Sequence, residues 1–242
     1  MTQLLYSCNS KTYFCKNGEK EEETVAKGTI FPILPDNVQN YQETVYTEET
    51  NVSVTVYGTG DLSGLVCEIN DGLYYIDKDM SAQRIVSSYT DCEVSADGTA
   101  LLYLRGDSLY RVKNLKKSLE PEKIEDIEGV SGFAANKDLN RLYYLNDDNE
   151  LMYFGGSGKP VKIYDDDIKS VLVVGDKLYF VGDYSRGTGT LYVSDKGSKR
   201  KSIAEVAEIE NLAGRLYYTT EDNELYMLDG DKPVKVLDDI AN

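Results

Sequence analysis

Residues 141–166 read RLYYLNDDNELMYFGGSGKPVKIYDD, and residues 215–239 read RLYYTTEDNELYMLDGDKPVKVLDD. Both stretches open on RLYY, continue through D-N-E-L and K-P-V-K, and close on two aspartates. A chain that repeats one pattern at a distance is built from a structural module that recurs along it. The repeat is therefore the observation from which the fold can be inferred.

The module occurs more often than these two copies show. A leucine followed by an aromatic or apolar pair returns every 36 to 41 residues, at Leu101, Leu142, Leu178 and Leu216. Each is followed by a second apolar run and then a third, and a further unit fits upstream from Leu65. Turn residues such as Asn70-Asp71-Gly72 separate the runs, and a weaker strand precedes each leucine. Each unit therefore predicts four short antiparallel strands.

Four short strands repeated about every 40 residues are typical of a β-propeller blade. Residues 142–145 (LYYL) are apolar at consecutive positions, which fits a strand covered on both faces by neighbouring blades. A sheet with one wet face would alternate apolar and polar residues instead. We therefore predict an all-β fold, a β-propeller with about six blades, with five or seven as alternatives. A two-sheet sandwich is the rival, although it gives no reason for a period.

The propeller is expected to form a single domain over residues 1–242. Regular units occupy residues 61–240, whereas residues 1–60 form an irregular N-terminal unit and lead-in. A propeller must close its ring, because an open ring leaves unpaired strand edges. We expect closure by pairing of residues 1–6 with the last strand, residues 234–237.

Composition excludes several classes of function. The formal net charge is −16, which disfavours nucleic acid and anionic membrane surfaces as partners. The chain contains no histidine, so Ser-His-Asp and Cys-His catalysis, imidazole metal ligation and histidine pH switches are excluded. Tyrosine occurs 20 times and tryptophan is absent, which suits half-buried strands. We expect no cofactor and no metal.

Four cysteines, Cys8, Cys15, Cys67 and Cys92, show no C-x-x-C spacing. They allow two disulfides in three connectivities, or free thiols on packed strands. No run of about 18 apolar residues is present that would span a membrane as a helix. Residues 1–8 lack the features of a signal peptide. The chain is nevertheless compatible with the ectodomain of a longer protein.

A family resemblance adds to this interpretation. Residues 95–103, SADGTALLY, resemble the S-x-D-G-x-x-L-x-Y blade signature of TolB-type propellers. The tyrosine-rich units over residues 61–240 resemble propeller domains of unknown function from Gram-positive bacteria. That resemblance implies an extracytoplasmic domain, often part of a membrane-anchored surface protein. It transfers no catalytic residue, and other units replace the S-x-D-G turn with Asn136-Lys137-Asp138 or Gly175-Asp176.

One unit carries an insertion. Residues 182–189, GDYSRGTG, are expected to form a longer, glycine-rich loop than the hairpins of the other units. Tyrosine and arginine dominate binding hot spots, so Asp183, Tyr184 and Arg186 are the candidate binding residues. An adaptable surface tip without a role is the alternative.

Other polar motifs are interpreted as turns. The acidic clusters recur in several units, for example at residues 147–150 and 222–224, whereas an active site is needed only once. Asp and Asn suit hairpin turns, and no cluster matches an EF-hand. Arg105-Gly106-Asp107-Ser108 spells an adhesion tripeptide, yet it lies where a hairpin must turn.

The sequence thus favours a non-catalytic scaffold that binds a protein or glycan outside the cytoplasm, as a monomer. The alternative is a glycan-active enzyme with a carboxylate pair at the propeller channel, which needs no histidine. A cluster of acids at the channel mouth would favour the enzyme, and a rim rich in tyrosine and arginine would favour the binder. The sequence predicts no catalytic residue.

Overall fold

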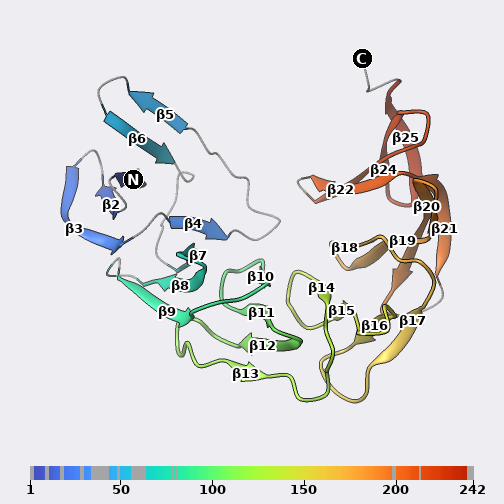
Figure 1. Cartoon of the computed structure of the whole chain (residues 1–242), viewed down its shortest axis with the longest axis horizontal. Helices are drawn as coiled ribbons and strands as arrows, with labels where there is room; N and C mark the ends of the chain where they lie inside the picture. The colour runs from blue at the N-terminus through green and yellow to red at the C-terminus, as the bar shows by residue number, and fades with distance from the viewer. Residues whose placement is uncertain are drawn as a thin grey trace. The chain divides into compact units, whose positions relative to one another are not determined.

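The computed structural model describes residues 64–238, apart from residues 78, 80, 198, 199 and 213, and the backbone of six strands between residues 3 and 55. The described residues form strands and turns and contain no helix (Figure 1). No helix among them is long and apolar enough to cross a membrane. The chain divides into two compact units, residues 1–105 with 110–122 and residues 106–109 with 123–242. Whether the chain is a single domain stays a prediction.

Two sheets lie at the N-terminal end of the chain. One has five strands in the order β3-β2-β1-β6-β5. Its strands are β1 (Gln3–Cys8), β2 (Lys11–Lys16), β3 (Glu19–Lys27), β5 (Thr44–Thr47) and β6 (Thr50–Thr55). The other has the order β4-β7-β8-β9, with β4 (Ile30–Ile33), β7 (Leu65–Ile69), β8 (Gly72–Ile76) and β9 (Ala82–Val86).

Four further sheets follow, each built from four consecutive antiparallel strands. The first comprises β10 (Asp91–Val94), β11 (Leu101–Arg105), β12 (Ser108–Val112) and β13 (Glu122–Lys123). The second comprises β14 (Gly132–Ala135), β15 (Leu142–Leu145), β16 (Leu151–Phe154) and β17 (Val161–Tyr164). The third comprises β18 (Ser170–Val174), β19 (Lys177–Ser185), β20 (Thr188–Asp195) and β21 (Lys201–Val206). The last comprises β22 (Glu208–Leu212), β23 (Arg215–Thr219), β24 (Leu225–Asp229) and β25 (Lys232–Leu237).

This arrangement confirms the four-stranded module. The described residues form five four-stranded sheets, which lies within the predicted range of five to seven blades. Leu65, Leu101, Leu142, Leu178 and Leu216 all lie on the second strand of their sheets, namely β7, β11, β15, β19 and β23. Each repeat unit of the sequence therefore corresponds to one four-stranded sheet.

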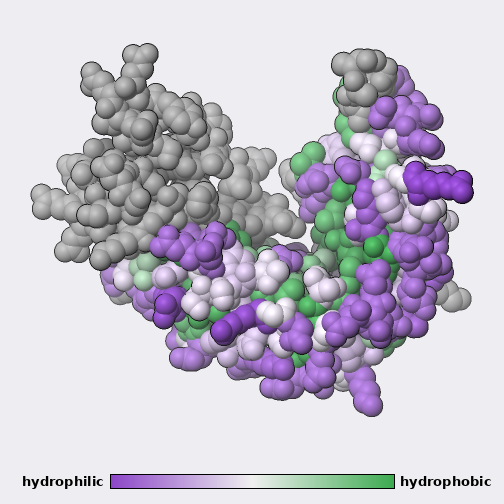
Figure 2. Space-filling view, viewed as in Figure 1, coloured by the Kyte–Doolittle hydropathy of each residue, from purple (hydrophilic) through white to green (hydrophobic). Residues whose placement is uncertain are grey.

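Strand β19, the second strand of its sheet, is buried on both faces, as its consecutive apolar residues predict. On β19, Leu178 and Phe180 belong to a core with Tyr143 of β15, whereas Tyr179 and Val181 belong to a core with Tyr218 of β23. All four β19 side chains are at most 5% exposed. In Figure 2, hydrophilic residues gather over the edge strands β17 and β21. Strand β19 thus contributes to two hydrophobic cores, one on either side.

The predicted closure of the ring by strand pairing is wrong. Strand β1 pairs with β2 along one edge and with β6 along the other, so neither edge is free to pair with residues 234–237. Strand β25 pairs with β24 and forms the end of its sheet. Strand β1 (Gln3–Cys8) is therefore an inner strand of its sheet, where the sequence pattern predicted a seam.

The cysteines and the adhesion-like tripeptide have simple local settings. Cys67 and Cys92 are free thiols, and burial raises the pKa of each to about 12. The side chains of Cys8 and Cys15 lie outside the described residues. Gly106 and Asp107 form the turn between β11 and β12, and Gly106 has a φ of 63°. The turn interpretation of this motif is confirmed.

Candidate functional site

The acidic clusters of the repeated sequence, residues 147–150 and 222–224, lie in hairpin turns, as predicted. Asn149 and Asn223 adopt left-handed φ angles of 59° and 57° at equivalent places between the second and third strands. Asn146 Oδ1 accepts hydrogen bonds from the backbone N–H groups of Asp148, at 3.1 Å, and Glu150, at 2.8 Å. Asn and Asp tolerate this backbone region and bond to their own turn, so local geometry accounts for the clusters.

The carboxylates beside these turns are held by lysines. Lys162 Nζ donates to Glu150 at 3.0 Å and to Asp165 at 2.8 Å. Hydrogen bonds from Asn146 and Lys162 lower the pKa of Glu150, and a hydrogen bond from Lys162 lowers that of Asp165. Carboxyl groups of this kind stay ionised at neutral pH and cannot serve as general acids.

The predicted insertion, residues 182–189, is an ordered hairpin and not a loose loop. Strands β19 and β20 extend through it, and Ser185 pairs with Thr188 across a two-residue turn. That turn is Arg186-Gly187, with φ angles of 53° and 101°. The extra residues are absorbed by a register shift between Gly182 and Ser185. The prediction of a long loop is wrong, because a β-bulge can accommodate extra residues while the two strands continue.

Asp183 points into a cluster of aromatic side chains. Its carboxylate accepts a short hydrogen bond from the Tyr164 hydroxyl and another from the Tyr192 hydroxyl at 2.5 Å. These bonds, that from Tyr164 first, lower the pKa of Asp183. The Arg200 guanidinium lies 4.6 Å from the centroid of the Tyr164 ring. Tyr164 is on β17 and Tyr192 on β20, so Asp183 connects two sheets.

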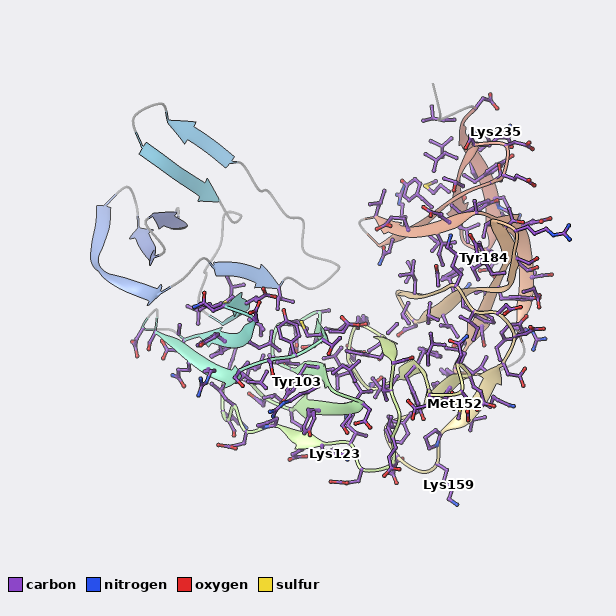
Figure 3. All side chains as sticks on the ribbon, in the orientation of Figure 1. Tyr103, Lys123, Met152, Lys159, Tyr184 and Lys235 are labelled. Atoms are coloured by element: carbon purple, nitrogen blue, oxygen red, sulfur yellow. The ribbon has the colours of Figure 1, made fainter. Side chains whose placement is uncertain are left out.

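Tyr184 and Arg186 have different surroundings. Lys169 Nζ donates to the Tyr184 hydroxyl at 3.0 Å and lies 4.5 Å from the centroid of its ring. Arg186 is exposed at the tip of the hairpin and forms no hydrogen bond or ion pair with any residue that the structure describes. Figure 3 labels Tyr184 within the last two sheets. The three predicted residues therefore do not form one site. Of the three, only Arg186 has no hydrogen bond or ion pair with the described residues.

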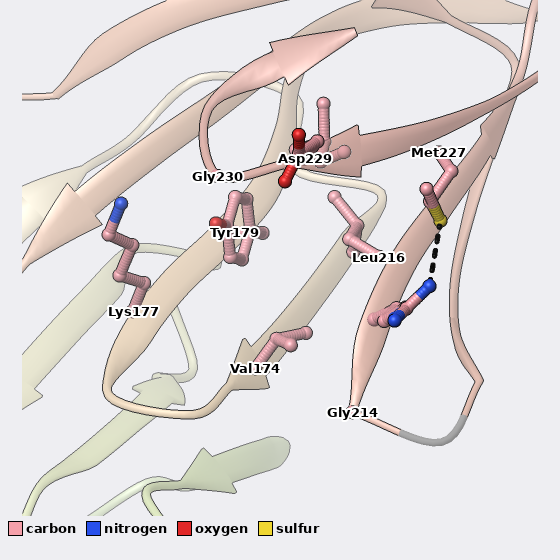
Figure 4. Close-up of a pocket in the computed structure, with 10 residues that line it drawn as sticks. Val174, Lys177, Tyr179, Gly214, Leu216, Met227, Asp229 and Gly230 are labelled. Carbon is pink, nitrogen blue, oxygen red and sulfur yellow. Dashed lines mark hydrogen bonds between the residues drawn. The ribbon is translucent and has the colours of Figure 1, made fainter. Parts of the chain in front are cut away.

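A second candidate site, which we call the strand-end groove, was missed by sequence reasoning. It is a hollow of about 510 Å³ at the ends of strands from the last two sheets (Figure 4). Its apolar lining comes from Val174 on β18, Tyr179 on β19, Leu216 on β23 and Leu228 on β24. This volume lies within the range of small-molecule sites, roughly 300–1,000 Å³.

Charged side chains line the rest of the groove. Lys177 Nζ forms an ion pair with Asp231 at 2.6 Å, and that contact raises the pKa of Lys177. Arg215 Nη1 lies 3.7 Å from Met227 Sδ, drawn as a dashed line in Figure 4. Among the described residues, neither Arg215 nor Asp229 forms an ion pair. No sequence signal predicts this groove, because it forms only when strand ends from two sheets meet.

Comparisons with known proteins inform the fold alone. No family model matches the chain, and no curated protein matches it. Among solved structures, an oligogalacturonate lyase in complex with manganese is 14% identical, with a TM-score of 0.54 over 96% of this chain and 73% of that one. A putative TolB from Agrobacterium tumefaciens is 11% identical, with a TM-score of 0.52 over 98% and 89%. A eukaryotic initiation factor is 9% identical, with a TM-score of 0.56 over 98% and 63%.

These likenesses support a β-propeller fold. The chain has no histidine, and no group of three or more Cys, Asp or Glu among the described residues could hold a metal ion.

Proposed function

We propose that this chain is a non-catalytic propeller scaffold that binds a protein or glycan partner. The observation that carries the proposal is a contrast in bonding. Several carboxylates have partners within the chain, whereas one exposed arginine has none among the described residues. Glu150, Asp165 and Asp183 are tied to lysine or tyrosine groups, whereas Arg186 projects free from an ordered hairpin. Groups without internal partners on a rigid element are suited to recognition.

The state of the acids argues against the glycan-active alternative. Glycoside cleavage by a carboxylate pair needs one carboxyl group that is protonated at working pH, and thus a raised pKa. Among the described carboxyl groups with a shifted pKa, only Asp91 has a raised one, because of burial. Those of Asp97, Glu150, Asp165, Asp183 and Glu224 are lowered. The lowered pKa values arise first from hydrogen bonds within the chain, so these five carboxylates are already engaged and do not supply the acid of such a pair.

The hairpin is the surface on which we place the partner. Its strands are fixed by cross-strand pairing up to Ser185 and Thr188, so Arg186 is presented by a defined backbone. Arginine offers a planar fork of donors for a carboxylate or a carbonyl group. Tyr184 supplies a half-buried ring beside it, held by Lys169. Because Asp183 is committed to two tyrosines, we assign it to the support of the hairpin and not to partner contact.

The proposal includes a setting for the domain. The resemblance to bacterial surface propellers supports a location outside the cytoplasm, and the net charge of −16 disfavours nucleic acid and membrane surfaces as partners. We propose that the domain acts as a monomer.

The test is retention of surface proteins and surface glycans of the source organism on immobilised domain. Wild type is compared with Arg186→Ser and with Arg84→Ser, an exposed arginine on β9 that serves as the matched control. We expect Arg186→Ser to lose most of the retained partner and Arg84→Ser to keep it. Equal retention by all three proteins would remove the hairpin from the proposal.

A further inference from the structure

We propose that the strand-end groove binds an acidic sugar, a polyhydroxyl ring that carries a carboxylate. The inference rests on the proposed function, since it names the chemistry of a glycan partner, but it uses a different surface from the hairpin. Its central residue is Arg215, which begins β23 and lines the groove. The groove belongs entirely to residues 174–230 of the second unit.

Arg215 is the natural carboxylate anchor of this groove. It is exposed, and its contact in the groove is the weak one to Met227 Sδ at 3.7 Å. A guanidinium forms its best contacts with carboxylates, through two parallel N–H···O bonds. By contrast, Lys162, Lys177 and Lys235 already hold carboxylates of this chain. Arg215 forms no ion pair among the described residues, so its guanidinium is available to a ligand carboxylate.

Lys177 and Asp229 supply the remaining polar groups. Lys177 has three N–H donors, and its ion pair with Asp231 occupies one of them. Asp229 is exposed and forms no ion pair within the described part of the chain, so its carboxylate can accept hydrogen bonds. In Figure 4, Lys177 and Met227 lie on opposite sides of Tyr179 and Leu216. Donors and acceptors thus lie around a lining whose partly exposed apolar side chains are Val174 and Met227.

This combination favours a sugar over an acidic peptide. Sugar hydroxyl groups both donate and accept, so one ring can bond to Asp229 and to Lys177 while its C–H face lies on Val174 and Met227, which are partly exposed. An ionised acidic side chain of a peptide is acceptor-only and has no donor for Asp229. A neutral sugar would leave Arg215 without its preferred partner. The carboxylate and the hydroxyl groups together match the charges that the groove presents.

The experiment is isothermal titration of the full chain with three probes. They are a short oligosaccharide of hexuronic acid, the same oligosaccharide with its carboxyl groups reduced to alcohols, and poly-L-glutamate. The hexuronic oligosaccharide should bind, and each of the other two should bind at least tenfold more weakly. Arg215→Gln should weaken binding of the acidic oligosaccharide at least tenfold, as expected for loss of charge-assisted hydrogen bonds. Arg84→Gln, which lies on a different sheet, should leave it unchanged.

Arg215→Lys keeps the charge but loses the fork, and should fall between wild type and Arg215→Gln. It also serves if Arg215→Gln does not fold, as judged by its melting curve. Absence of binding by the acidic oligosaccharide, equal binding of its reduced form, or preference for poly-L-glutamate would each overturn the proposal. If the acidic oligosaccharide does not bind but Arg186→Ser still loses the retained partner, the proposed function stands and only the groove proposal fails. If neither experiment gives the expected result, both proposals fail.

Discussion

Lys162 and Lys235 occupy the same position in two sheets and hold the same pair of acidic side chains. Lys162, on β17, bonds to Glu150 and Asp165, and Lys235, on β25, bonds to Glu224 and Asp238. In each copy, the glutamate precedes the third strand and the aspartate follows the fourth. The repeated sequence of residues 141–166 and 215–239 therefore encodes an ion-pair network. In each copy this network joins the outer strand of the sheet to the strand beside it.

The two lysines should respond alike to substitution. We expect Lys162→Met and Lys235→Met each to lower the melting temperature at low ionic strength, by similar amounts. The difference from wild type should shrink in about 1 M salt, because exposed ion pairs are screened there. Lys159→Met is the control, since Lys159 is exposed and forms no ion pair among the described residues (Figure 3). An effect no larger than that of the control would show that the network is incidental.

The paired tyrosines of the RLYY elements should be large contributors to stability. Tyr144 is 4% exposed and Tyr218 3% exposed, at equivalent positions on β15 and β23. Substituting either with alanine should lower the free energy of unfolding by about 3–5 kcal/mol, as for other buried aromatic residues. Chemical denaturation measures this directly. Tyr217→Ala, at a half-buried neighbour, should cost less, and losses below about 1 kcal/mol at both buried sites would contradict burial on both faces.

Gly182 should not tolerate a side chain. A Cβ atom at this position would collide with the Tyr164 ring, whose Cζ would lie 2.8 Å away. Overpacking of this kind costs about 1–3 kcal/mol. Gly132→Ala is the matched control on strand β14, because no atom lies within 4 Å of its added Cβ.

The double variant Gly182→Ala with Tyr164→Leu separates collision from other causes. Removing the ring should make the combined loss in the free energy of unfolding smaller than the sum of the two single losses. Strict additivity would mean that the glycine is needed for a reason other than Tyr164.

Asp183 should contribute to acid sensitivity. Hydrogen bonds from Tyr164 and Tyr192 lower its pKa below the usual value of about 3.9. A depressed pKa in the folded state adds stability above the unfolded pKa, and that stability is lost as pH falls through the folded pKa. Asp183→Asn should therefore reduce the dependence of unfolding free energy on pH below about pH 4. An unchanged pH profile of the Asp183→Asn variant would contradict this role.

The sequence predicts the sheets well because each depends on local signals. Leucines at a fixed spacing mark the buried second strands, and Asn or Asp marks their turns, so the module emerges without tertiary information. The insertion was misjudged because glycines at 182, 187 and 189 indicate a loop as readily as a bulged hairpin. Asp183 could not be assigned, since its partners Tyr164 and Tyr192 come from two sheets.

The strand-end groove illustrates the same limit. Arg215 and Lys177 lie on different strands of different sheets, and nothing in their local sequences distinguishes them from other exposed cations. Only the meeting of the sheets gives them a common hollow. Recognition surfaces of this kind arise from packing and are therefore absent from any one unit of the repeat.

The central claim is that the domain binds its partner and does not transform it. The most direct measurement is mass spectrometry of the partner retained by the immobilised domain, after prolonged incubation with an excess of wild-type protein. Our account predicts that the partner is recovered intact, and that recovery falls with Arg186→Ser but not with Arg84→Ser. A cleaved or otherwise altered partner, formed only in the presence of the domain, would contradict it.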